Sequence, residues 1–349
     1  MSELLAPEAA SLRSLPKVQL HVHLDGSVRL PTILDIAQQD GLDLGADSLE
    51  ALAAKCQVTQ PVSGLPALLD VFWVHQRVLN SYRNIRRVTF ENIEDAWRDG
   101  VRLLELRFAP TFIAAGKPGL TNDEIINAVL DGVQEGMAAY PIELGLIVIT
   151  VRDLELSTNR QALLDALRFR RSAHPMAERI VGFDLAASEM GTRPEDFVEL
   201  VAMARAGGLG ITVHSGEDTT AAHVQRTIEV LAPERIGHGI QAWHDPAVVQ
   251  LLKMKGIHLE VSITSNWLTR SVASFAAHPI RKLYDAGVSL SINTDDPHLM
   301  GIDLVHEYRL AQKLFGFELS DFERMNREAL AHSFLPERLK KRVNLLGNE

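Results

Sequence analysis

The stretch VQLHVHLDG, Val18–Gly26, places two histidines two residues apart near the end of an apolar run. Successive side chains of a strand point to opposite faces, so His21 and His23 are expected to share one face. Valine and leucine around them are typical of a strand buried on both sides of a parallel sheet. The stretch therefore predicts a buried strand with two nitrogen donors at its carboxyl end.

Similar apolar runs recur along the chain, with helix-like segments between them. Most are rich in Val, Ile and Leu and show little polar alternation, as expected of parallel strands. The predicted strands are Val18–Leu24, Arg102–Phe108, Glu143–Val151, Ile180–Ala186, Gly210–His214, Arg235–Gly239, His258–Ile263 and Ser289–Asn293. Helices are predicted at Gln161–Ala173, Pro194–Ala206, Ala221–Leu231 and Pro246–Lys255. This alternation predicts an α/β fold, a (β/α)8 TIM barrel, with residues 1–349 as a single domain.

The interval after the first strand differs from the others. Residues Asp25–Asp99 contain about five helix-sized segments and no convincing strand. Two of them, Gly64–Leu79 and Asn84–Asp99, are long and amphipathic. We interpret residues 26–99, approximately, as a helical lid insertion over the mouth of the barrel. The segment Asp321–Leu346 is also predicted to be helical and to close the side of the barrel.

Composition and charge exclude several classes of protein. The apolar fraction of 46% is that of an ordinary globular protein, and no apolar run is long enough to span a membrane. Cys56 is the only cysteine, which excludes an intrachain disulfide and favours a reducing compartment. The N-terminus is too acidic for a signal peptide, and the net charge of −10 argues against binding nucleic acid. We expect a cytoplasmic protein without membrane or nucleic-acid partners; the oligomeric state is not indicated.

Potential metal ligands stand at the ends of four predicted strands. In barrels of this type, functional side chains come from the carboxyl ends of the strands. Nitrogen and carboxylate donors without a thiolate suit a zinc-type ion that keeps one position open for water. Because distant segments supply the donors, we interpret the site as catalytic rather than structural. The candidate ligands are His21, His23, His214, His238 and Asp295.

Each motif also has a simpler explanation. A His-X-His pair on a buried strand can be two hydrogen-bonded core histidines. Glu217 could swing back over the pocket because Gly216 permits a tight turn, or it could cap the next helix. The run Asp295-Asp296-Pro297 can begin a helix with proline at its first position and still supply a ligand. His298 follows this run and stays a candidate, whereas the other histidines are assigned no role.

Together, the motifs resemble those of the adenosine deaminase family of the metal-dependent amidohydrolase superfamily, in particular its bacterial members. The resemblance covers about Leu15 to about Leu335. It includes less familiar stretches such as FENIEDA (Phe90–Ala96), LELRFAP (Leu104–Pro110) and GIDLVHEY (Gly301–Tyr308). The motifs that carry it are His-Val-His-Leu-Asp-Gly, Gly-Phe-Asp-Leu-Ala, His-Ser-Gly-Glu, Arg-Ile-Gly-His-Gly and Asn-Thr-Asp-Asp-Pro.

The resemblance implies hydrolysis of adenosine and 2′-deoxyadenosine to inosine and 2′-deoxyinosine, with release of ammonia. It implies one Zn²⁺ per chain; no lysine, which a second ion would need, stands at the end of the fourth strand. Glu217 would donate a proton to ring N1, His238 would hold and polarise the attacking hydroxide, and Asp295 would accept the proton of the water. The implied metal ligands are His21, His23, His214 and Asp295.

The substrate is less closely specified than the reaction. The resemblance implies substrate contacts from His23, from Asp25 to the ribose, from Ala187 to purine N3 and from Asp296 to N7. The family motif Leu-Ala-Gly-Asp-Glu is here Leu-Ala-Ala-Ser-Glu, Leu185–Glu189, and the family's Ala-Gly-Glu is Ser-Gly-Glu followed by a further acid. On strand seven, the usual cysteine is a serine.

These departures leave alternatives open within the same class: adenine, an N6-substituted adenine nucleoside or nucleotide, or 6-aminodeoxyfutalosine. An amidase or phosphoesterase on the same barrel is disfavoured by Glu217 and by the missing lysine on strand four. A non-enzymatic barrel would be expected to lack at least one ligand or the proton donor, and this chain has all of them.

Overall fold

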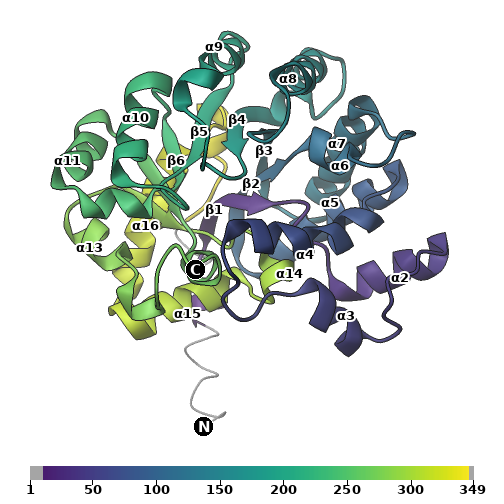
Figure 1. The fold of residues 1–349 in the computed structure, drawn as a ribbon, viewed down its shortest axis with the longest axis horizontal. Coiled ribbons are helices and arrows are strands. Elements are labelled where there is room, and N and C mark those ends of the chain that lie inside the picture. Colours follow the sequence, from purple (N-terminus) through teal and green to yellow (C-terminus); the bar gives the residue numbers. More distant parts are fainter. Residues whose placement is uncertain (1–10, 346–349) are drawn as a thin grey trace.

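Eight parallel strands form a nearly closed barrel, and helices surround it (Figure 1). The computed structural model describes residues 11–345. The strands pair in sequence order, and backbone hydrogen bonds from His23 to Asp295 and from Asp295 to His21 join the last strand to the first. They are β1 (Lys17–His23), β2 (Val101–Phe108), β3 (Glu143–Val151), β4 (Ile180–Ala186), β5 (Gly210–Ser215), β6 (Arg235–His238), β7 (His258–Val261) and β8 (Leu290–Ile292). The predicted (β/α)8 barrel is confirmed.

The predicted strand boundaries hold within about two residues, and the largest difference lies at β7. Ile263 was predicted to end this strand but begins helix α12 (Ile263–Leu268) instead. The carboxylate of Glu307 accepts hydrogen bonds from the backbone N–H groups of Ile263 and Thr264, at 2.8 and 3.2 Å. Because a helix start leaves such donors unpaired, this distant carboxylate favours the turn into a helix.

Outside the strands, the helices follow the barrel order. Those that cover the barrel between β2 and β8 are α6 (Pro110–Ala114), α7 (Asn122–Ala139), α8 (Leu156–Arg170), α9 (Val198–Ala206), α10 (Ala221–Leu231), α11 (Pro246–Lys255) and α13 (Ile280–Asp285). The prediction for α10 and α11 is confirmed to the residue. Among the residues from 11 to 345, no helix is both long and apolar enough to cross a membrane.

The insertion between β1 and β2 contains four helices, not the predicted number of about five. They are α2 (Leu30–Asp40), α3 (Leu49–Cys56), α4 (Leu65–Val78) and α5 (Tyr82–Arg98). The link between α3 and α4 is attached to the barrel's carboxyl end: Val58 N–H donates to Leu299 O at 2.8 Å, and Val62 N–H donates to Leu268 O at 3.0 Å. The insertion therefore lies on the side of the barrel where the strand ends carry the site.

The C-terminal segment covers the barrel in two places. Helix α16 (Leu319–His332) packs against β8 and β1. This agrees with the prediction that a helical C-terminal segment closes the side of the barrel. Beyond it, Glu105 of β2 accepts hydrogen bonds from Ser333 Oγ and Phe334 N–H, both at 2.6 Å, so the chain also closes the amino end of the barrel. Helix α17 (Glu337–Lys340) follows. Leu346, where the predicted helical segment ends, lies outside the described residues, as do residues 1–10.

Candidate active site

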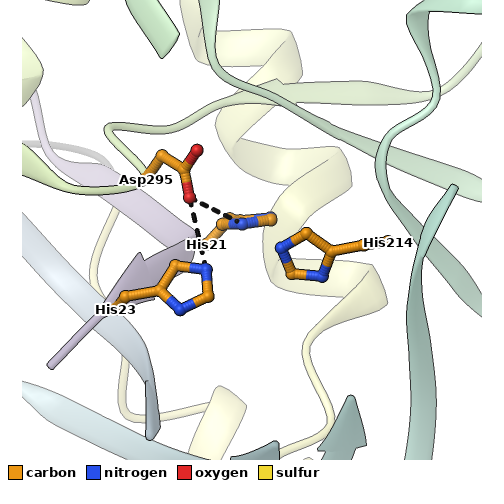
Figure 2. Close-up of side chains that lie close together, drawn as sticks. All are labelled: His21, His23, His214 and Asp295. Carbon is orange, nitrogen blue, oxygen red and sulfur yellow. Dashed lines mark ion pairs between the residues drawn. The ribbon is translucent and has the colours of Figure 1, made fainter. Parts of the chain in front are cut away.

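Four predicted metal ligands meet at the carboxyl end of the barrel (Figure 2). His21 and His23 come from β1, His214 from β5, and Asp295 follows β8, and one donor atom of each lies within 4.8 Å of the others. His21 Nε2 and His23 Nε2 lie 3.1 and 3.3 Å from Asp295 Oδ1. His21 Nε2 is buried but makes no hydrogen bond. Such a convergence of unpaired nitrogen and carboxylate donors fits a divalent cation.

Two buried carboxylates orient the histidine rings. Glu260 Oε2 lies 2.9 Å from His21 Nδ1, and Asp184 Oδ1 lies 3.1 Å from His214 Nδ1. With Nδ1 bonded to a carboxylate, Nε2 is left to face the metal position, an arrangement common in metal sites. Burial lowers the pKa of His214 to about 3, so this ring is neutral and can act as a ligand at neutral pH. Arg107 neutralises both acids, at 2.7 Å from Asp184 and 2.6 Å from Glu260.

Sequence reasoning did not assign a role to Asp184 or Glu260. Both stand inside apolar strands, β4 and β7, and both are fully buried. A charged residue in a strand buried on both faces needs a partner, since an unpaired buried charge is costly. The sequence therefore indicated that each of these acids has a partner, but it did not indicate which residue that partner is.

Asp295 has a backbone conformation that is unusual for its residue type. Its φ is +64°, in the left-handed region that short polar residues tolerate better than others. Ser265 Oγ donates to Asp295 Oδ2 at 2.7 Å and leaves Oδ1 for the histidines. Burial alone would raise the pKa of Asp295, but His21 and His23 hold it well below its usual range. Asp295 is therefore a carboxylate that can coordinate a metal or accept a proton.

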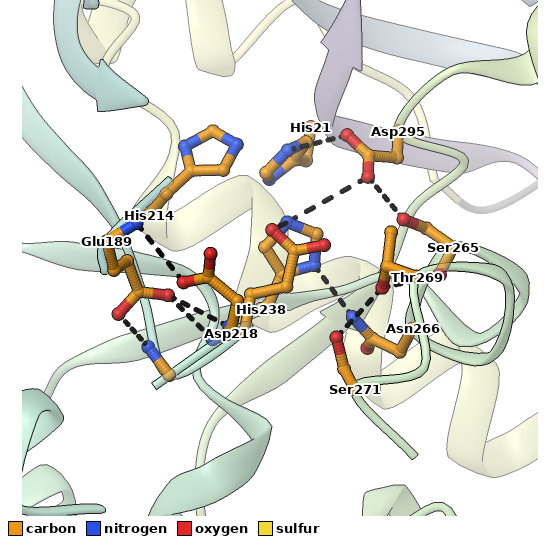
Figure 3. Close-up of polar contacts among 12 residues, drawn as sticks. His21, Glu189, His214, Asp218, His238, Ser265, Asn266, Thr269, Ser271 and Asp295 are labelled. Carbon is orange, nitrogen blue, oxygen red and sulfur yellow. Dashed lines mark hydrogen bonds and ion pairs between the residues drawn. The ribbon is translucent and has the colours of Figure 1, made fainter. Parts of the chain in front are cut away.

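His238 lies beside the metal position and is not one of the four converging donors (Figure 3). Its Nε2 is 3.5 Å from Glu217 Oε2 and 3.8 Å from Asp295 Oδ2. Its Nδ1 is 3.0 Å from the amide nitrogen of Asn266, whose oxygen lies 3.1 Å from His278 Nε2. An amide donor at Nδ1 places the proton of a neutral ring on Nε2, facing the cavity. His278, which was assigned no role, thus orients His238 through Asn266.

Glu217 lies in the cavity and is 4% exposed. Burial raises its pKa well above the ordinary value, and the nearby carboxylate of Asp295 raises it further. Its backbone N–H donates to Glu189 Oε1 at 2.8 Å. The structure therefore places next to the four donors a carboxyl group whose surroundings favour its protonated form. The alternative, that Glu217 only caps the next helix, is wrong, since Thr220 caps α10.

The cavity that contains these groups has a volume of about 280 Å³, near the lower end of the range for small-molecule sites. Asp25, Ala187 and Asp296 line it together with His23, His214 and Asp295, three of the four converging donors. Its apolar wall comes from α4 and from the segments that follow β2 and β3: Leu65, Leu68, Phe72, Trp73, Phe112 and Leu154. His298 is not in this wall; it contacts Asp95 at 2.9 Å.

Three predicted substrate-binding residues show how the cavity is built. Ala187 has a φ of +73°, in the left-handed region that favours glycine. This explains why the family motif has a glycine at this position, and it means that the alanine backbone is strained. Asp25 Oδ2 accepts a hydrogen bond from Gln76 of α4 at 3.0 Å. Asp25 Oδ1 and Asp296 Oδ1 are buried without a hydrogen bond. A Cβ on Gly26 would lie 1.8 Å from Asp296 Oδ1, so the glycine of the first motif makes room for this acid.

Comparisons with known proteins agree with this arrangement. The sequence profile of the family described as adenosine deaminase matches residues 16–346. Adenosine deaminase from Erwinia tasmaniensis is 38% identical over 330 residues, which are 94% of this chain and 97% of that protein. Adenosine deaminase from Salmonella paratyphi C is also 38% identical, over 94% of this chain and 96% of that protein.

Two solved deaminase structures share this fold. Adenine deaminase from Arthrobacter aurescens superposes with a TM-score of 0.85 at 26% identity, covering 94% of this chain and 98% of that one. The Arabidopsis N6-mAMP deaminase superposes with a TM-score of 0.83, also at 26% identity, covering 96% and 98% of the two chains.

Proposed function

The chain belongs to the adenosine deaminase family, hydrolases of the amidohydrolase superfamily, and we propose that it converts adenosine and 2′-deoxyadenosine to inosine and 2′-deoxyinosine, releasing ammonia. One observation carries the proposal: Glu217, whose pKa is raised by burial, lines the same small cavity as His23, His214 and Asp295 of the four converging metal donors. The names of the relatives at 37–38% identity support adenosine as the substrate.

The donor set supports one Zn²⁺ per chain, held by His21, His23, His214 and Asp295. When bound, such an ion supplies Lewis acidity that lowers the pKa of water from about 15.7 to about 7. Among the described residues, Lys and Arg are absent from β4, where a second ion would require a lysine. The family and the donor chemistry thus favour a single-ion site.

The residues of this chain supply the remaining chemistry. Glu217 donates its proton to ring N1 as water attacks C6, which relieves the negative charge that develops on the ring. His238, with its proton on Nε2, orients the attacking oxygen. Asp295 accepts the proton of the water and passes it to the leaving amine. A positioned acid of this kind typically contributes about 10²–10⁴-fold to the rate.

Two unpaired buried carboxyl oxygens support recognition of a nucleoside. Burial and the neighbouring Asp295 raise the pKa of Asp296 well above its ordinary value, which favours a protonated carboxyl group that can donate to the acceptor N7. Asp25 offers Oδ1 to a ribose hydroxyl. The resemblance to the family assigns the backbone N–H of Ala187 to purine N3, and His23 to the metal and the substrate; both residues line the cavity.

The charge of the cavity disfavours a nucleotide. Lys and Arg are absent from the described residues that line the cavity, whereas Asp25 and Asp153 are present. A 5′-phosphate would meet these acids, and the cavity wall offers no cation to pair with it. Free adenine stays the second candidate, because adenine deaminase from Arthrobacter aurescens has the same fold with a TM-score of 0.85.

A panel of purines tests the proposal directly. We expect ammonia release from adenosine and 2′-deoxyadenosine with kcat/KM values well above those for adenine, AMP, N6-methyl nucleosides and aminodeoxyfutalosine. The measurement is a coupled ammonia assay with the metal-loaded protein. Faster turnover of adenine than of adenosine would replace the proposed substrate with adenine.

Replacing Asp25 by alanine tests the contact to the sugar. We expect kcat/KM for adenosine to fall by about 10-fold or more, because a buried partner for a ribose hydroxyl is lost, at roughly 1–3 kcal/mol. The slow turnover of adenine, which has no ribose, should change little. Normal adenosine kinetics in the Asp25→Ala variant would remove Asp25 from substrate recognition.

A further inference from the structure

Two loops at the carboxyl end of the barrel carry the purine contact and the proton donor. The first follows β4 and contains Ala187, and the second follows β5 and contains Glu217. Neither loop is part of a regular element at these positions. Because the acid and the purine contact must act on one ring together, the relative position of the loops decides whether both groups can be used.

The two loops are joined by reciprocal hydrogen bonds (Figure 3). Glu189 N–H donates to Asp218 Oδ1 at 3.1 Å, and Asp218 N–H donates to Glu189 Oε1 at 3.3 Å. Ser188 Oγ adds a third bond, to Asp218 Oδ2 at 2.8 Å. We call Ser188, Glu189 and Asp218 the inter-loop bridge. Each loop thus donates a backbone N–H to a carboxylate on the other.

The bridge also holds the backbone of the proton donor. Glu189, 2% exposed, accepts N–H bonds from Gly216 and Glu217 at 2.7 and 2.8 Å. On the other side, Arg152 donates to the carbonyl oxygens of Ala187 and His214, at 3.1 and 2.6 Å. Ala187 needs such support, since its positive φ is unfavourable for an L-residue with a side chain.

We propose that Asp218 is a positioning residue that holds Ala187 and Glu217 in one arrangement. Its carboxylate accepts the Glu189 N–H and the Ser188 hydroxyl of the first loop, and its own N–H donates back to Glu189. Only the kinetic test of the role of Asp218 rests on the proposed deamination.

Removal of the carboxylate tests the proposal. In metal-loaded Asp218→Ala, we expect kcat for adenosine to fall by about 10- to 100-fold, because small misplacements of reacting groups cost that much. KM should rise less, since Glu217 acts during the chemical step. The metal content should stay at the wild-type value. Asp196→Ala is the matched control: Asp196 accepts the Arg193 N–H at 3.2 Å but does not bond to the second loop.

An exchange of the two side chains separates positioning from a general loss of stability. Ser188→Asp combined with Asp218→Ser places the acid on the first loop and keeps a hydroxyl opposite it. We expect this double variant to recover kcat to within about threefold of wild type, as coupled partners do in a double-mutant cycle. Unchanged kcat in Asp218→Ala, or failure of the exchange to restore it, would overturn the proposal.

Hydrogen exchange provides a readout that does not depend on the substrate. In Asp218→Ala the amide of Glu189 should exchange faster than in wild type, while amides of β4 keep their protection. Equal exchange of this amide in the two proteins would also overturn the proposal. If wild type releases no ammonia from adenosine, the proposed function fails, but this measurement still decides whether the inter-loop bridge exists.

Discussion

Replacing Asp295 by alanine is expected to remove the bound metal and the hydrolytic activity together. Asp295 is the only anionic donor of the four-residue cluster and lies within 3.3 Å of both β1 histidines. It is also the proposed acceptor of the proton from water. We expect a loss of at least about 10⁴-fold in kcat/KM, since both the Lewis acid and the base are lost. Elemental analysis and ammonia release measure the two effects separately.

His298→Ala is the control for the Asp295 variant. His298 lies three residues further along the chain but contacts Asp95 rather than the metal-binding cluster. We expect wild-type metal content and near-normal turnover for this variant. A metal-loaded, active Asp295→Ala protein would contradict the assignment of the ligand. Two ions per active wild-type chain would contradict the single-ion site.

Glu217→Gln is expected to keep the metal and lower kcat by about 10²-fold or more, because glutamine preserves the shape and cannot deliver a proton to N1. The wild-type pH profile provides the second readout. The pKa of Glu217 is raised by burial and by Asp295, so the acid form persists to higher pH than in an ordinary glutamate, and activity is lost as pH rises through that pKa. The variant should lack this limb of the profile.

Glu195→Gln serves as the control for the charge change, because Glu195 pairs with Arg226 at the surface away from the cavity. We expect its kinetics to match wild type. Near-normal turnover in metal-replete Glu217→Gln would remove Glu217 from the role of proton donor.

The barrel could be predicted from the local sequence pattern, because strands that are buried on both faces appear in the sequence as apolar runs. Ile180–Ala186 and Glu143–Val151 were predicted to the residue. The end of β7 was not, since the helix there depends on Glu307, 44 residues away. The insertion was predicted as helical, but the predicted number of about five helices is wrong, since the structure has four. The prediction of a single domain with a lid stays a prediction.

The sequence by itself determined the residue types at the strand ends, and with them the likeness to the adenosine deaminase family and the metal donors. Parallel strands bring their carboxyl ends together, so motifs far apart in the chain can be assigned to one site. Only the tertiary structure decided which carboxylate orients which histidine, that Asn266 and His278 hold His238, and that Asp218 reaches across to Ser188. These contacts depend on the direction of each side chain and on the spacing between neighbouring loops. The order of residues along the chain does not determine either of them.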